Sequence, residues 1–151
     1  MNRKLPLDTL IELASERCDR AALRLAELLK AQTGARERLS LLLQYRDEYV
    51  AQFHERMRGG LTCSQMRNYQ LFVATLDGAI EQQRQLAREA AARLAEGRGD
   101  WQASKRRLGA FDTLAARARR NDAIAAGRQE QREGDERSIA RLHLRSTAFA
   151  G

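Results

Sequence analysis

Proline, cysteine and aromatic residues are scarce in this sequence of 151 residues, and each shortage excludes a class of structure. A single Pro leaves almost no internal signal for ending a helix. Two Cys supply neither a disulfide framework nor a set of zinc ligands, and they indicate a reducing compartment. Only 1 Trp, 3 Tyr and 4 Phe are present, so the 43% of hydrophobic residues is mostly Ala and Leu. Such a composition favours long helices over a thick globular core.

Long apolar runs are also missing. No stretch approaches the ~20 apolar residues that a membrane-spanning helix needs, and no apolar signal region follows the basic residues at the start. We therefore expect one cytoplasmic domain covering residues 1–151, with a formal charge of 27 − 20 = +7 from Lys+Arg and Asp+Glu.

The first third of the chain carries a heptad pattern. Pro6 and the pair Thr9 and Glu12, spaced as a capping box, mark its start, and we predict a helix over residues 8–57. Steps of four and three residues are typical of a coiled-coil seam. The seam positions that are small or apolar are Leu7, Ile11, Ala14, Cys18, Ala21, Leu25, Leu28, Ala35, Leu39, Leu42, Tyr49 and Phe53.

A turn over residues 58–62 separates this pattern from a second one. Gly59 and Gly60 permit a tight reversal, and Thr62 with Gln65 predicts the capping box of a helix from residue 63 to about 140. We expect a disordered tail from about 146 to 151. The second seam is Met66, Tyr69, Val73, Leu76, Ile80, Gln83, Ala87, Ala90, Leu94, Gly97, Trp101, Ser104, Leu108, Phe111, Ala115 and Ala118.

Two heptad helices joined by a short turn run antiparallel, so the pairing can be calculated. If Phe53 faces Tyr69, facing residue numbers add up to 122, which places Trp101 opposite Ala21 and Gly97 opposite Leu25. Large residues then meet small ones, as a narrow seam requires. The predicted fold is all-α, a long antiparallel two-stranded coiled coil. In this register Leu7 pairs with Ala115, so the second helix continues beyond its partner, and we expect it to fray there.

Aromatic residues gather near the turn. Tyr49, Phe53 and Tyr69 occupy seam positions, whereas Tyr45 and Phe72 lie outside the seam on one shared flank, which Ala79 and Leu86 continue. An apolar flank where charge is usual indicates a binding surface or a widened core. At the seam itself, Arg46, Gln32 and Gln83 either fix the register or meet a partner.

No catalytic or metal-binding set is evident. His54 and His143 stand apart from any cluster of ligands, and Cys18 and Cys63 are too distant to bridge, so we expect no cofactor and no enzymatic activity. Basic runs near Arg107 and Arg120 permit binding to nucleic acid or an anionic membrane. A basic helical protein that binds nucleic acid or an anionic membrane is therefore the alternative function. Because no aromatic platform accompanies the basic runs, nucleic acid is not expected as a partner in the preferred interpretation. A passive spacer is a third possibility.

Several runs together resemble the FliJ family of flagellar export proteins over nearly the whole chain. They are residues 42–49, 68–72, 76–83, the lone Trp101 and residues 130–136. The resemblance implies an antiparallel coiled coil similar to the hairpin of the rotary ATPase gamma subunit. It implies a soluble, non-catalytic stalk of the flagellar type III export apparatus, at the cytoplasmic face of the cell membrane.

The resemblance also implies the partners and their contact residues. The partners are the hexameric export ATPase, the cytosolic part of the membrane export gate, and export chaperones. The gate-binding residues would be Arg38, Leu42, Tyr45, Tyr49, Phe72, Leu76, Ala79 and Gln83. The residues at the end that enters the ATPase ring would be Ile11, Phe111, Leu114, Arg117 and Arg120.

Overall fold

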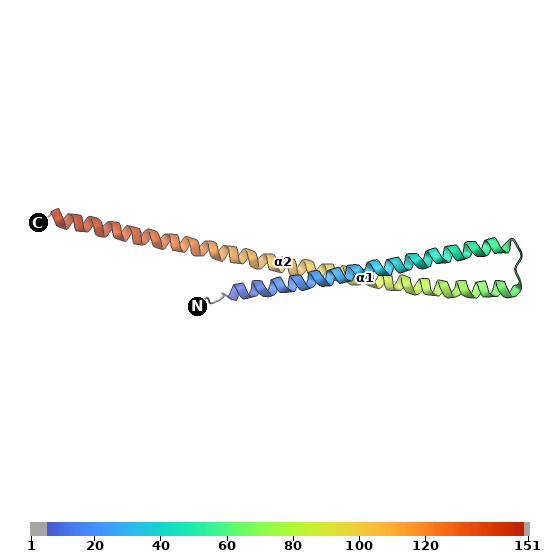
Figure 1. Ribbon diagram of the computed structural model, residues 1–151. Helices are drawn as coiled ribbons and strands as arrows, with labels where there is room; N and C mark the ends of the chain where they lie inside the picture. The colour runs from blue at the N-terminus through green and yellow to red at the C-terminus, as the bar shows by residue number, and fades with distance from the viewer. Residues whose placement is uncertain (1–5, 150–151) are drawn as a thin grey trace. The chain divides into compact units, whose positions relative to one another are not determined.

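The computed structural model describes residues 6–149 and consists of two helices, α1 (Pro6–Met57) and α2 (Cys63–Phe149). The helices run in opposite directions from the connecting turn and pack against each other (Figure 1). No strand occurs over residues 6–149, so the predicted all-α hairpin is confirmed. The chain divides into two compact units: residues 16–105, which include the turn, and the segments before Glu16 and after Lys105.

The start of α1 differs from the prediction. The helix begins at Pro6, so Thr9 lies inside the first turn and does not cap the helix start. Proline is favourable at the first helical position because its missing N–H would have no helical partner there. Asp8 adds a negative charge beside the positive end of the helix dipole.

The turn follows the sequence prediction closely. Gly60 has φ +87°, a backbone conformation that only glycine adopts without strain. The Gln65 N–H donates to Thr62 Oγ1 at 3.1 Å, and the Thr62 N–H donates to Gln65 Oε1 at 3.0 Å. This reciprocal pair confirms the capping box and starts α2 at Cys63.

Within residues 16–105 the seam follows the calculated register. Phe53 and Tyr69 stack with ring centroids 3.4 Å apart, as a sum of 122 requires. A Cβ atom placed on Gly97 would lie 2.5 Å from Leu28 Cδ1 and 3.9 Å from Leu25 Cδ1, so this glycine lets the helices approach. The seam is thin, because its best-covered side chains here are only Ala35, Leu76, Ile80 and Leu94.

In the other unit, the segments 6–15 and 106–149 pair only briefly. Ala14 and Ala115 are buried, and Ile11 and Phe111 are half-buried. Every described residue from Ala116 onward is exposed, as the calculated end of pairing predicts. The helix end differs from the prediction, because α2 continues past residue 140 to Phe149 and includes most of the segment expected to be disordered. Residues 137–149 contain neither Gly nor Pro, so nothing in that segment breaks the helix.

Candidate binding surface near the turn

Five aromatic rings connect α1 to α2 next to the turn, all within residues 16–105. Tyr49 lies at their centre, with its ring centroid 4.4 Å from that of Phe72, 5.7 Å from Tyr69 and 6.5 Å from Tyr45. Tyr45 meets Phe72 edge-on at 6.2 Å. These are separations at which aromatic pairs attract beyond the effect of area burial. The rings therefore form one continuous cluster that leads from the seam to the surface.

The outer members of this cluster remain open to solvent. Tyr45 is 50% exposed and Phe72 is 37% exposed, although they touch each other and Tyr49. Leu86, on the same flank, is 51% exposed, and Ala79 is half-buried. The rings therefore widen the core, as one of the two interpretations of the sequence holds, and they leave an apolar surface open to solvent. We call this surface the aromatic flank (Tyr45, Phe72, Ala79 and Leu86), and its role in binding stays a prediction.

The other residues predicted to bind the gate differ in accessibility. Arg38 is exposed, Leu42 and Gln83 are half-buried, and Leu76 is buried at 7% exposure. The Gln83 side chain donates from Nε2 to the Ala35 carbonyl oxygen at 3.0 Å, which joins α2 to α1. Leu76 and Gln83 therefore serve the packing of the hairpin. The exposed members of the predicted set are Arg38, Tyr45 and Phe72, and Ala79 beside them is half-buried.

A cross-helix ion pair joins the seam residue Arg46 of α1 to Asp77 of α2. Arg46 Nε donates to Asp77 Oδ1 at 2.5 Å, and Nη2 lies 3.4 Å from Oδ2. The hydrogen bond from Arg46 lowers the pKa of Asp77 and raises the pKa of Arg46, with the charge attraction between them adding to both shifts. The heptad pattern alone did not identify Asp77 as the partner of Arg46. The register places Arg46 opposite Leu76, and the acidic residue directly after Leu76 could have indicated the pair.

The residues predicted to enter an ATPase ring belong to the other unit. Ile11 and Phe111 are half-buried between the helices there, whereas Leu114 is 49% exposed. Arg117 and Arg120 are exposed and lie beyond the last paired residue, Ala115. Leu114 and the two arginines are therefore the accessible members of this set.

Over residues 6–149 no three His, Cys, Asp or Glu side chains come together as a metal site requires. Cys18 and Cys63 are free thiols. Neither α1 nor α2 contains a stretch apolar enough to span a membrane, over the residues that the structure describes.

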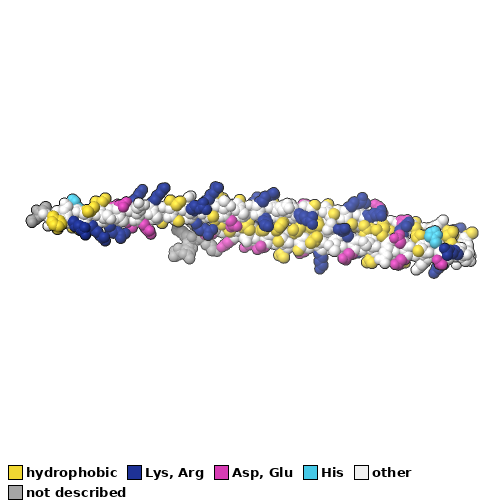
Figure 2. All heavy atoms as spheres, turned by 90° about the horizontal axis from the view of Figure 1, so that it is seen from above, with side chains coloured by type: hydrophobic (Ala, Val, Ile, Leu, Met, Phe, Trp, Pro, Cys, Tyr) yellow, Lys and Arg dark blue, Asp and Glu magenta, His cyan; other side chains and the backbone are white. Residues whose placement is uncertain are grey.

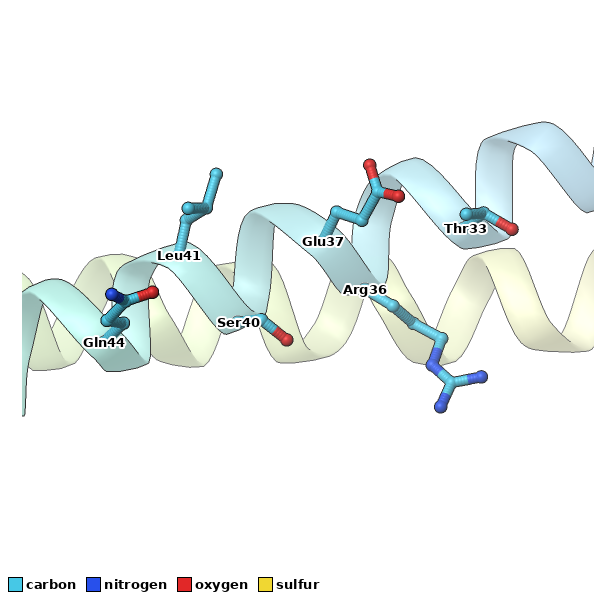
Figure 3. Close-up of a pocket in the computed structure, with 6 residues that line it drawn as sticks. All are labelled: Thr33, Arg36, Glu37, Ser40, Leu41 and Gln44. Carbon is cyan, nitrogen blue, oxygen red and sulfur yellow. The ribbon is translucent and has the colours of Figure 1, made fainter.

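An open hollow of about 540 Å³ lies along α1 between Thr33 and Gln44 (Figure 3). All six of its lining residues come from that one helix, and Leu41 and Glu37 point away from α2, so the hollow encloses nothing.

The fold and this surface define the class: an antiparallel two-helix coiled-coil protein with an exposed aromatic flank. Comparison with known proteins then identifies the family. The family model described as "Flagellar FliJ protein" matches residues 3–147, so the chain belongs to the FliJ family. It is 33% identical over 130 residues to the flagellar FliJ proteins of Salmonella typhi and of Escherichia coli strain K12. Each match covers 86% of this chain and 88% of the relative.

Proposed function

We propose that this chain is a non-catalytic component of the flagellar protein export apparatus that connects the export ATPase ring to the membrane export gate. Membership of the FliJ family supports the placement in the flagellum. The observation that carries the connecting role is the presence of two separate accessible surfaces, the aromatic flank in one unit and the unpaired end of α2 in the other. A protein that binds two partners needs at least two such surfaces.

The aromatic flank suits a protein partner such as the cytosolic part of the gate. Tyr and Phe side chains supply large contact areas at little entropic cost, and they are enriched at interfaces. Arg38 adds a cation on the same flank, at the position two turns before Tyr45. The packing of Tyr45 against Tyr49 and Phe72 holds the rings in place before a partner arrives.

The unpaired part of α2 suits insertion into a ring. From Ala116 to Phe149 the helix has no partner within the described chain. The exposed Arg117 and Arg120 lie at the start of this segment, and the exposed Leu114 lies just before it. A helix without symmetry inside a six-fold ring contacts some subunits more than others. Such differential contact biases the subunits toward different nucleotide states or promotes ring assembly. Export chaperones, and an association with the cytoplasmic face of the membrane through the gate, complete the proposed set of interactions.

The ATPase part is tested by the hydrolysis rate and ring assembly of the cognate export ATPase, measured with and without the full chain. The comparison is a chain truncated before Leu114. Stimulation that the truncated chain loses supports insertion of this end into the ring. No effect of the full chain at saturating concentration contradicts the stalk role and leaves the gate as the principal partner.

The gate part is tested with the double variant Tyr45→Ala and Phe72→Ala in a binding assay against the cytosolic part of the gate. We expect at least a tenfold loss of affinity, since exposed aromatic anchors dominate interface energy. The matched control is Leu41→Ala with Leu71→Ala, which removes two exposed leucines outside the flank, 65% and 63% exposed. Equal losses in both double variants would contradict a specific role of the flank.

The basic-binder alternative predicts a different outcome in a third assay. Retention on heparin or on anionic vesicles would depend on the arginines near Arg107 and Arg120 and would be unaffected by loss of Tyr45 and Phe72. Arginine-dependent retention, without any effect of the chain on the export ATPase or the gate, would favour that alternative.

A further inference from the structure

A groove with unpaired arginines lies between the two helices, and it is lined by none of the residues of the aromatic flank. Its volume is about 590 Å³, and α1 and α2 both line it. The lining is Gln32, Arg36 and Leu39 of α1 with Glu81, Arg84, Ala87, Arg88 and Ala91 of α2, so three arginines border it with one carboxylate. We call this set the basic groove. All of its residues lie within residues 16–105, so it belongs to a single compact unit.

The groove has a simple origin in the seam. The calculated register places Ala87 opposite Ala35, since 35 + 87 = 122, and two alanines leave the space that larger side chains would fill. The Gln83 amide, which bonds to the Ala35 carbonyl, holds the helices at this point. Leu39, Ala87 and Ala91 then provide an apolar floor that is open to solvent.

The charge around this floor is positive and mostly uncompensated. Arg88 pairs with Glu81 at 3.1 Å, but both side chains of that pair are about two-thirds exposed. Within the described chain, no carboxylate lies within ion-pair distance of Arg36 or Arg84. Arg98 and Lys105 follow Arg84 at intervals of 14 and 21 residues, which are whole heptads, so the same flank continues basic along α2.

Hydrophobic surface is accessible on the hairpin between Lys and Arg side chains (Figure 2). An apolar floor bordered by arginines selects one kind of occupant among those that fit between two helices. Arginine binds carboxylates through two parallel hydrogen bonds, and an apolar side chain of the occupant removes the floor from water. A second copy of this flank would bring like charges together, which disfavours self-association through it.

We propose that the basic groove is a docking site for an acidic amphipathic helix of another protein, in which apolar residues are bordered by Glu or Asp. The apolar side chains lie on Leu39, Ala87 and Ala91, and the carboxylates pair with Arg36 and Arg84. This is the helix-in-groove mode of recognition, with the charges setting orientation and association rate. The site is separate from the aromatic flank, so both surfaces accept partners at the same time.

The test uses the full chain and three synthetic helical peptides of about 20 residues, titrated by fluorescence anisotropy. The first peptide has Leu along one face bordered by Glu. The second replaces the Glu with Gln, and the third replaces the Leu with Ala. We expect the first to bind at least about tenfold more tightly than the other two, because both the floor and the arginines contribute. Equal binding of the first and third peptides would overturn the proposal, since the floor would then have no role.

The matched variants carry equal changes in charge on opposite flanks. Arg36→Glu with Arg84→Glu should weaken the first peptide at least about tenfold, whereas Arg24→Glu with Arg93→Glu, on the flank of Tyr45, should leave its affinity within about threefold. Circular dichroism checks that each variant folds, and Arg36→Gln with Arg84→Gln replaces the first pair if it does not. Equal losses in the two pairs would show attraction by net charge alone and would overturn the site.

A single-stranded oligonucleotide tests the competing class of ligand. Tighter binding of the oligonucleotide than of the first peptide, lost in Arg36→Glu with Arg84→Glu, would assign the groove to nucleic acid and overturn the proposal. The variant Tyr45→Ala with Phe72→Ala should retain peptide binding. That result separates this inference from the proposed role of the aromatic flank, so either can fail without the other.

Discussion

At the scale of single residues, the hairpin depends on a few positions where the heptad rule is broken. Arg46 occupies a seam position but its side chain pairs with Asp77 on the other helix. Gln83 donates a hydrogen bond from its side-chain amide to the Ala35 carbonyl oxygen. Gly97 has no side chain where Leu28 needs space. Each exception has a partner on the other helix, so each helps to select one register among the shifted alternatives.

The Arg46 and Asp77 pair predicts a pH dependence of stability. The pKa of Asp77 is lowered, chiefly by the hydrogen bond from Arg46, so the stabilisation is present above the unfolded pKa of about 3.9 and is lost as pH falls through the lower folded value. Urea unfolding should show Asp77→Asn to be less stable than the natural chain at pH 7. The difference should shrink as the pH falls below about 4 and disappear below the folded pKa of Asp77. Asp19→Asn, which removes an exposed carboxylate without a cross-helix pair, is the control. A difference for Asp77→Asn that stays constant down to the lowest pH would contradict the role of the ion pair.

Gly97 and Gly99 offer a matched pair of substitutions within one turn of α2. A Cβ atom at Gly99 meets nothing within 4 Å, so Gly99→Ala should raise the free energy of unfolding by about 1 kcal/mol through helix propensity. Gly97→Ala gains the same propensity but must displace Leu28 Cδ1, and it should be clearly less stabilising than Gly99→Ala or destabilising. Thermal unfolding followed by circular dichroism measures both. Equal stabilisation by the two would contradict the close approach of the helices at Gly97.

At the scale of secondary-structure elements, the starts of the two helices are built differently. α1 begins on Pro6, which needs no N–H partner, while α2 begins on the reciprocal hydrogen bonds of Thr62 and Gln65. The turn adds the positive φ of Gly60. The reversal between the helices therefore rests on two local devices, and a tight turn needs both.

Loss of the capping box should be measurable. Thr62→Ala should lower the free energy of unfolding by about 1 kcal/mol, because the Gln65 N–H loses its acceptor. Ser64→Ala, an exposed position inside the first turn of α2, is the control and should change stability by less than about 0.5 kcal/mol. Chemical denaturation of both variants tests this, and a Thr62→Ala variant as stable as the control would contradict it.

At the scale of the whole molecule, the two helices bury very little. No charged or polar side chain over residues 6–149 is buried, and the buried hydrophobic set consists of three alanines, two leucines and one isoleucine. Stability is consequently distributed along the seam, and it ends where the seam ends, at Ala115. The 34 residues from 116 to 149 form helix although none of them is buried by the rest of the described chain, and Gly127 and Gly134 lie within them.

Hydrogen exchange should reveal this difference. Amides of residues 116–149 should exchange much faster than those of residues 20–100, because an isolated helix frays whereas a paired one opens only with its partner. Removing residues 121–151 should therefore leave the urea midpoint of the rest nearly unchanged. Slow exchange in that segment of the isolated chain, or a large loss of stability on truncation, would show that it packs against something in solution, such as a second copy. Protection that arises only when a partner is added would agree with the proposed insertion.

The sequence by itself determined the helical hairpin, the turn, the second cap and the register. An α-helix has a fixed repeat, so the heptad pattern specifies which residues face the other helix without knowledge of side-chain positions. That is why Phe53 meets Tyr69, and why pairing stops at Ala115. The same pattern also placed Tyr45 and Phe72 on one flank.

Tertiary structure alone decided how deeply each facing residue is covered and which polar groups meet. Leu76 is buried while Phe72 stays exposed, and Arg46 pairs with Asp77. Leu39, Ala87 and Ala91 line an open groove. These outcomes depend on the local distance between the helices and on side-chain rotamers, which periodicity does not specify. The binding surfaces of this protein are therefore only outlined by its sequence, and their accessible residues come from the packing of one helix on the other.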